Sequence, residues 1–302
     1  MKIGIDFGGH TMIAALIAAG EAGQKPPRIE RRTQRETPPG RGVVAVMEML
    51  ADAIGELVCG FEHTSVDFAG VAMPGMLDAK RRSARKMANF PIEWDRVDIT
   101  AAMTSTLRER GLDLTIRIEN DANCYALGEG SAGAAAGLRD YVVLTMGTGI
   151  GCGIVLDGKL LTGAHGMAGE AGHIVVDGDA PCGCGGMGHP ETLAAADGTA
   201  RRARAAGLPE DFAALWRMRG DVVVDGVLDV TLDAMARTIA GVGHTLDPEM
   251  IVIGGGMSRA PGLLEALQQR VYPYLSRPFR GVLNLQISPL GNDAALFGAV
   301  RI

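Results

Sequence analysis

The sequence lacks any apolar run long enough to cross a membrane. A spanning helix needs about 18 or more consecutive apolar residues, and the 302 residues contain no such run. The opening, MKIGIDFGGHTM, is too short and too interrupted by glycine for a signal peptide. The net charge of −6 also lacks the basic excess typical of nucleic-acid binding. We therefore expect a cytoplasmic protein whose partners include neither a membrane nor a nucleic acid.

Two common nucleotide-binding motifs are also missing. No stretch matches the P-loop pattern G-x-x-x-x-G-K-[ST], and no G-x-G-x-x-G opens a helix after the first predicted strand. These absences disfavour a P-loop nucleotidase and a Rossmann dehydrogenase. The sequence has instead three glycine turns, at residues 8–9, 147–149 and 254–256, each directly after an apolar segment. Because glycine has no Cβ, such turns let backbone N–H groups approach a phosphate closely.

Asp6 ends the first predicted strand, beside the first of these turns. Mg²⁺ takes one or two carboxylates and keeps several of its waters, so an Asp at this point can hold Mg²⁺ directly or through water. A turn-capping Asp is the alternative. We predict phosphate binding by glycine hairpins, with Asp6 serving the metal.

The five cysteines are an odd number, and cytosolic cysteines normally stay reduced. We expect Cys59, Cys124 and Cys152 to be small buried hydrophobes. Cys182 and Cys184 instead lie within GEAGHIVVDGDAPCGCGGMGHPE, residues 169–191, with a histidine on either side. Zinc takes four nitrogen or sulfur ligands in a tetrahedron. The residues alone leave two readings open, a zinc site and a glycine-rich loop that happens to hold cysteines.

Apolar strands alternate with helical patterns along the chain, which predicts an α/β protein with mixed sheets. The N-terminal stretch GIDFGGHTMIAAL resembles VLTMGTGIGCGIVL in the middle of the chain, so we expect two lobes of like architecture, each presenting a glycine hairpin. Strands are expected at 2–6, 11–19, within 20–42, and at 65–75, 114–121, 140–161 and 249–253, and helices at 43–61, 98–111, 122–133, 224–246 and after residue 257.

These motifs together resemble the ROK family (repressors, open reading frames and kinases) of bacterial sugar kinases, within the actin-like ATPase superfamily. The resemblance covers essentially the whole chain. The motifs that carry it are GIDFGG (4–9), VAMPG (71–75), ENDAN (119–123), MGTGIGCGIV (146–155), TGAHGMAGEAGHI (162–174), CGCGGMGHPE (182–191) and LDPEMIVIGGG (246–256).

The resemblance implies a two-lobed, ribonuclease H-like fold with mixed sheets and a cleft where sugar and ATP meet. The lobes would be residues 1–119 plus 292–302, and residues 120–291. It also implies a homodimer that phosphorylates a hexose at its 6-hydroxyl, using ATP and Mg²⁺, with glucose as the first candidate. A structural zinc would hold the cysteine-rich loop.

The family's functional residues map onto this sequence position by position. Asp121 is the implied general base, and a strand-end carboxylate in IENDAN is well placed to accept a proton; a helix N-cap is the simpler role for it. The implied sugar ligands are Asn120, Glu170, His173 and Glu191, together with the base Asp121, and we add Asn89 in ANFPIEW as a further candidate. The implied nucleotide contacts are Gly9, Thr148, Gly149, Gly254 and Gly255, to which we add Asp6 and His10 as candidates from the sequence itself. The implied zinc ligands are His173, Cys182, Cys184 and His189.

Two positions depart from the family pattern. His10 stands where the family usually has Thr, close to where the ATP phosphates are expected, and it either contacts them or points away. His189 stands where the family usually has a Cys as the last zinc ligand, and a Cys₂His₂ set is an equally feasible zinc site.

Two other functions compete with the kinase. A sugar-responsive repressor would need a helix-turn-helix ahead of the first strand, which we do not expect because that strand begins at Lys2. A sugar-binding protein without kinase activity is the other alternative, and the presence of Asp121 argues against it.

Overall fold

The computed structural model describes the chain except residues 19, 21–25, 39, 41, 62–65 and 86–89. The described chain forms two compact units, each with its own core. The first comprises Met1–Gly137, Leu160–Ala168 and Asn292–Ile302, and the second comprises Leu138–Lys159 and Gly169–Gly291. Residues 120–137 thus pack with the first unit here, and the expected lobe boundary at residue 119 stays a prediction.

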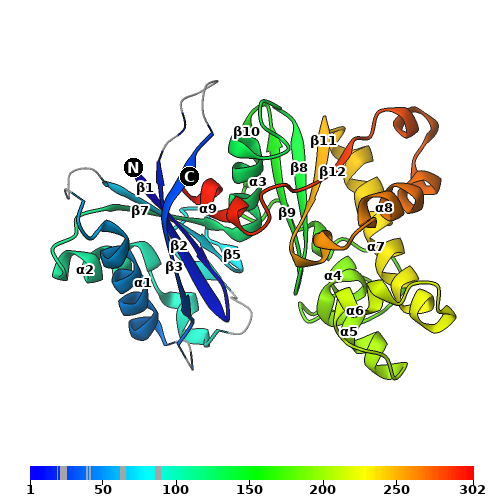
Figure 1. Ribbon diagram of the computed structural model, residues 1–302, viewed down its shortest axis with the longest axis horizontal. Helices are drawn as coiled ribbons and strands as arrows, with labels where there is room; N and C mark the ends of the chain where they lie inside the picture. Colours follow the sequence, from blue (N-terminus) through cyan, green and yellow to red (C-terminus); the bar gives the residue numbers. More distant parts are fainter. Residues whose placement is uncertain (19, 21–25, 39, 41, 62–65, 86–89) are drawn as a thin grey trace. The chain divides into compact units, whose positions relative to one another are not determined.

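The first unit is built on a five-stranded mixed sheet of order β3-β2-β1-β4-β7 (Figure 1). The central strand β1 runs antiparallel to β2 and parallel to β4, and β4 is parallel to β7. A small hairpin, β5–β6, lies beside it. The strands are β1 (Lys2–Phe7), β2 (Thr11–Ala18), β3 (Arg28–Glu36), β4 (Phe68–Met73), β5 (Met76–Leu77), β6 (Ala84–Arg85) and β7 (Thr115–Asn120).

Side chains alternate across β1, so its two faces pack against different helices. Ile3, Ile5 and Phe7 are buried in the core formed with α1 (Val43–Val58) and α2 (Ile99–Glu109). The opposite face meets α9 (Asp293–Ala299), which in turn packs on α3 (Asp121–Ala132). Asp6 alternates with Ile5 and Phe7 and so lies on the α9 side of the strand.

Glycines allow α9 to approach the sheet closely. A Cβ on Gly70 of β4 would lie 1.7 Å from the carbonyl oxygen of Ala299, and one on Gly4 of β1 would lie 2.3 Å from that of Leu296. The helices α3 and α9 meet in the same way, since a Cβ on Gly298 would lie 1.6 Å from the Cys124 carbonyl oxygen. The C-terminal helix is therefore part of the first unit's core.

The second unit repeats this sheet. Its strand order is β10-β9-β8-β11-β12, with β8 antiparallel to β9 and parallel to β11, which is parallel to β12. Because the five strands correspond in order to those of the first sheet, and β8, β9, β11 and β12 correspond in direction as well, the weak internal repeat of the sequence is confirmed. The strands are β8 (Tyr141–Met146), β9 (Ile150–Leu156), β10 (Lys159–Leu160), β11 (Met250–Gly254) and β12 (Leu285–Ile287).

Helix α7 (Val222–Leu246) supplies much of the second core, together with α8 and the short helices α4 to α6 (Figure 1). No helix in the described part of the chain is long and apolar enough to span a membrane. The remaining helices of this unit are α4 (Pro190–Ala194), α5 (Ala196–Ala205), α6 (Phe212–Arg217) and α8 (Leu263–Val271), and the short 3₁₀ segments of the chain are η3 (Ile92–Arg96), η4 (Ala171–His173), η5 (Gly256–Arg259), η6 (Tyr272–Tyr274) and η7 (Arg277–Gly281).

Candidate active site and metal cluster

Carboxylates gather where the parallel strands of the first sheet end. The register aligns Asp6 on β1 with Ala72 on β4, and Ala72 with Glu119 on β7. Asn120 and Asp121 directly follow Glu119 in the chain. The pKa of Asp6 is raised to about 7, first by burial and then by the nearby charge of Asp121, while Arg32 opposes both effects. Two carboxylates that destabilise each other's charge form a donor set that suits a divalent cation.

The start of α3 corrects one expectation about Asp121. The N-cap is Asn120, whose Oδ1 accepts a hydrogen bond from the backbone N–H of Asn123 at 3.1 Å, and Asp121 is the first helical residue. The Asn120 amide also donates to the carbonyl oxygen of Gly75 at 3.1 Å. Asn120 keeps one N–H and one lone pair for a sugar hydroxyl, and its role as a sugar ligand stays a prediction.

A buried ion pair behind Asp121 was not expected from the sequence. Glu119 is 5% exposed, and its carboxylate accepts from Asn123 Nδ2 at 2.9 Å and from the Asn120 backbone N–H at 2.8 Å. Arg81 Nε lies 3.0 Å from the same carboxylate, and Arg81 Nη1 donates to the Gly166 carbonyl oxygen at 3.0 Å. This network fixes the corner from which Asp121 projects.

Arg81 adopts a backbone conformation that normally favours glycine. Its φ is 54°, in the left-handed region, at the turn between β5 and β6. A non-glycine residue persists there only when its surroundings over-determine the conformation. The ion pair with Glu119 supplies that constraint.

The first glycine hairpin is held mainly through its backbone. Gly8 N–H donates to the Thr11 carbonyl oxygen at 2.9 Å, and Thr37 donates its hydroxyl to the Gly8 carbonyl oxygen at 2.8 Å and its backbone N–H to that of His10 at 2.9 Å. His10 is exposed. Among the described residues, a Cβ on Gly9 would meet only Phe90, at 3.9 Å. The roles predicted for Gly9 and His10 stay predictions, and Asn89 lies outside the described residues.

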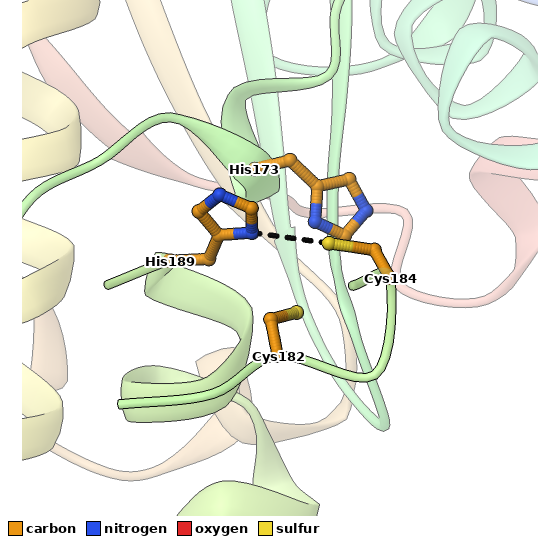
Figure 2. A group of neighbouring side chains, drawn as sticks. All are labelled: His173, Cys182, Cys184 and His189. Atoms are coloured by element: carbon orange, nitrogen blue, oxygen red, sulfur yellow. Dashed lines mark hydrogen bonds between the residues drawn. The ribbon is translucent and has the colours of Figure 1, made fainter. Parts of the chain in front are cut away.

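Figure 2 shows His173, Cys182, Cys184 and His189 gathered into one cluster. Their ligand atoms all lie within 4.8 Å of one another, with His189 Nδ1 3.2 Å from the Cys184 sulfur. His173 Nδ1 is buried and has no hydrogen-bond partner among the described residues. A Cβ on Gly186 would lie 2.4 Å from the His189 ring, so this glycine makes room for the imidazole.

The thiols of the cluster are also suited to a metal. Burial raises the pKa of Cys182, but hydrogen bonds from the backbone of Cys184 and the side chains of Thr192 and Cys184 outweigh it, and the net pKa is lowered. A lowered pKa favours the thiolate, the form that ligates metal. The sulfur atoms, the unpartnered imidazole nitrogen and the space around His189 together fit a tetrahedral Cys₂His₂ zinc site.

The other three cysteines lie outside this cluster. Cys124 and Cys152 are buried as expected, whereas Cys59 is exposed, so the expectation that Cys59 is buried is wrong.

His173 connects the cluster to two carboxylates. Its Nε2 lies 3.7 Å from Glu170 and 4.0 Å from Glu191. Burial raises the pKa of Glu170, with a further rise from the charge of Glu191, while His173 opposes both. A histidine that ligates a metal with one nitrogen usually directs its other nitrogen to a carboxylate; here Nε2 of His173 faces two carboxylates at distances longer than a hydrogen bond.

Two glycines, one on either side of Glu170, allow its segment of chain to pack closely against β9. A Cβ on Gly169, whose φ is 91°, would lie 2.4 Å from the Cys152 carbonyl oxygen, and one on Gly172 would lie 2.3 Å from that of Ile150. The pattern GEAGH is thus explained by close packing on the strand that follows the second glycine hairpin.

Two glycine turns lie side by side in the second unit. Thr145 and Gly254 are partners in the β8–β11 register, so residues 147–149 and 254–256 follow adjacent parallel strands. Gly255 has a φ of 82°, and a Cβ there would lie 2.4 Å from the Met146 carbonyl oxygen. Four predicted nucleotide contacts therefore share one edge of this sheet: Thr148, Gly149, Gly254 and Gly255.

The model of the ROK family matches residues 2–302. The chain belongs to the ROK family. A protein of Thermotoga maritima named glucokinase is 34% identical to this ROK protein, covering 99% of this chain and 96% of its own length. A protein of Salmonella heidelberg named N-acetylmannosamine kinase is 31% identical, covering 99% of this chain and 97% of its own length.

Solved structures agree with this assignment. The crystal structure of a ROK family glucokinase from Streptomyces griseus, in complex with glucose and AMPPNP, matches with a TM-score of 0.81 and 26% identity, covering 99% of this chain and 98% of that chain. The agreement confirms the predicted two-lobed, actin-like ATPase fold with mixed sheets.

Proposed function

We propose that this ROK protein is an ATP-dependent hexokinase that phosphorylates the 6-hydroxyl of a hexose, with glucose as the first candidate. Its relatives over nearly the full length are sugar kinases, and the Streptomyces griseus structure holds glucose with an ATP analogue. The single observation that carries the assignment within this chain is Asp121 at the N-terminus of α3, charge-coupled to Asp6 at the ends of parallel strands.

Asp121 acts as the general base in this proposal. The sugar hydroxyl oxygen bonds to the γ-phosphorus of ATP, the bond from that phosphorus to the β–γ bridging oxygen breaks, and ADP leaves. The hydroxyl proton passes to the Asp121 carboxylate. A carboxylate in the first turn of a helix is stabilised as the anion, which keeps Asp121 ready to accept the proton.

Asp6 would hold Mg²⁺, directly or through water. The ion supplies neutralisation of phosphate charge, on which phosphoryl transfer largely depends. The glycine turns that carry Gly9, His10, Thr148, Gly149, Gly254 and Gly255 would bind the nucleotide through backbone N–H groups.

Sugar hydroxyls would be recognised by Glu170, His173, Glu191 and Asn120. A site built to hydrogen-bond hydroxyls strongly rejects analogues that lack them, which suits a polyol substrate. The cluster of His173, Cys182, Cys184 and His189 would bind one structural zinc that orders this loop. A cytoplasmic homodimer, bound to neither nucleic acid nor a membrane, completes the proposal.

A coupled assay of ADP release across a panel of hexoses tests the function. Glucose, mannose, fructose, allose and N-acetylmannosamine present different hydroxyl patterns to the same carboxylates. We expect at least one of them to stimulate ADP release in wild type and not in Asp121→Asn. Sugar binding without turnover in wild type would favour a ROK sugar-binding protein instead.

A further inference from the structure

Glu191 lies against the second glycine hairpin as well as against His173. One carboxylate oxygen, Oε2, accepts a hydrogen bond from the backbone N–H of Ile150 at 3.3 Å. The other, Oε1, lies 4.0 Å from Nε2 of His173. The Glu191 carboxylate thus faces both the imidazole of His173, a proposed sugar ligand, and Ile150, which directly follows the turn proposed to bind phosphate.

The turn leaves room for this carboxylate at one position. A Cβ on Gly149 would lie 2.6 Å from Oε2 of Glu191, closer than real Cβ contacts come, whereas a Cβ on Gly147 would meet no atom of the described residues within 4 Å. Within one turn, therefore, one glycine is in contact with Glu191 and the other has no such neighbour in the described part of the chain.

The segment that carries Glu191 begins at the metal cluster. His189 is the N-cap of α4, and Glu191 lies in the first turn of that helix. A few residues later, Ala196 N–H donates to the Gly147 carbonyl oxygen at 2.8 Å. Residues 189–196 thus run from a metal ligand to two hydrogen bonds that hold the hairpin.

We propose that Glu191 is a positioning residue for the nucleotide site, which couples hexose binding to the conformation of the Gly147–Gly149 turn. The inference rests on the proposed function and deepens it, since Glu191 then does more than contact the sugar. Coupling between two sites is reciprocal. A change on the turn must alter sugar affinity in the absence of nucleotide, and a change at Glu191 must alter nucleotide affinity in the absence of sugar.

Gly149→Ala tests the coupling from the turn, with Gly147→Ala as the matched control. Both add one methyl group to the same turn, but only the first displaces the flexible end of Glu191. Glucose binding, measured by calorimetry without nucleotide, should weaken at least about fivefold in Gly149→Ala, the lower end of typical coupling between sites. It should be unchanged in Gly147→Ala.

Glu191→Ala tests the coupling from the sugar side, with Glu170→Ala as the control. Glu170 faces the same His173 nitrogen at 3.7 Å but makes no hydrogen bond to the hairpin among the described residues. AMPPNP binding, measured without sugar, should weaken at least about fivefold in Glu191→Ala and be unchanged in Glu170→Ala. Thermal denaturation of all four variants establishes that each is folded, and the two pairs alter different elements.

The outcomes of these experiments distinguish failure of the proposed coupling from failure of the proposed kinase function. Wild type that binds both ligands, with each variant equal to its matched control, would overturn the coupling and leave the kinase assignment intact. Wild type that binds neither glucose nor AMPPNP would overturn both.

Discussion

The two units share one sheet topology but equip the same edge of it differently. In the first, the ends of β1 and β7 carry carboxylates, and a buried pair of Arg81 and Glu119 holds them in place. In the second, β8 and its neighbour β11 are followed by glycine turns, and the unit also holds a Cys/His cluster. The repeated sheet provides the platform, and the loops added to its carboxyl edge determine the chemistry.

The two glycine hairpins show the same contrast on a smaller scale. The first, at residues 8–10, is held by hydrogen bonds from Thr37, which directly follows β3. The second, at residues 147–149, is tied by Glu191 and Ala196, which follow His189 of the Cys/His cluster in the chain. Loss of metal should therefore disturb the second hairpin and leave the first intact.

Among these predictions, the largest effect on turnover is expected when the carboxylate of Asp121 in the first unit is removed. Asp121→Asn cannot accept the hydroxyl proton, and loss of a general base typically slows turnover by about 10² to 10⁴-fold. Sugar binding should survive, because the amide keeps the size and one acceptor of the carboxylate. Steady-state turnover and calorimetry on the same sample measure both. A variant retaining more than about a tenth of wild-type turnover, well outside that range, would show that Asp121 is not the base.

Breaking the buried ion pair should come next. Arg81→Gly relieves the left-handed backbone but leaves Glu119 buried and unpaired, which typically costs about 3 to 5 kcal/mol of unfolding free energy. Denaturant titration should detect this loss, and Arg81→Gly combined with Glu119→Gln should recover part of it because the uncompensated charge is gone. No loss in the single variant would mean that the pair does not anchor the Asp121 corner.

Replacing Cys184 of the second unit tests whether the Cys/His cluster binds zinc. Wild type purified without added metal should contain about one zinc per chain, and Cys184→Ser should contain far less and melt at a lower temperature, because structural metal binding contributes to folding. Cys59→Ser, at an exposed cysteine outside the cluster, should match wild type. Elemental analysis decides between this result and a metal-free loop, which would give no zinc in any of the three.

The raised pKa of Asp6 predicts that the unfolding free energy depends on pH through this one carboxyl group of the first unit. Between the ordinary value of 3.8 and about 7, the folded carboxyl holds a proton that the unfolded chain has lost. Stability therefore falls as the pH rises through this window, by at most about 1.4 kcal/mol per pH unit. Asp6→Asn should abolish that slope in protein without Mg²⁺. Parallel pH profiles of unfolding free energy for the two proteins would contradict the assignment.

The smallest effect is expected at His10. If its exposed imidazole contacts a phosphate, His10→Thr should weaken ATP binding only about two- to fivefold, since exposed charge pairs contribute roughly 0.2 to 1 kcal/mol. Calorimetry with ATP measures this. Unchanged affinity would leave binding to the hairpin backbone, and tighter binding would identify His10 as an obstruction.

Local signals in the sequence predicted much of the fold. The glycine turns located the hairpins β1–β2 and β8–β9, and the helix expected at 98–111 forms as α2, where Asp98 is the N-cap and accepts a hydrogen bond from the Ala101 N–H at 3.0 Å. The C-terminal helix α9 was not predicted, because the reason for its position is non-local: it packs on Gly4 and Gly70 of distant strands.

The metal cluster was predicted in composition, and its four residues do converge, because they lie within one short stretch of chain. The support around the sites was not predicted. Strand alternation from Ile116 and Ile118 places Glu119 outward, yet Glu119 is buried because it is paired with Arg81 from a distant turn. The contact between Glu191 and Ile150 likewise joins segments separated by several elements, and no local pattern specifies it.

The central claim is that this ROK protein transfers phosphate from ATP to a hexose hydroxyl. Phosphorus NMR of a reaction of wild type with ATP, Mg²⁺ and the hexose that most stimulates ADP release tests it most directly. We predict equal amounts of ADP and a phosphate monoester coupled to the two protons on carbon 6, and no product from Asp121→Asn on the same timescale. Release of inorganic phosphate alone, or no sugar phosphate with any hexose of the panel, would contradict the account.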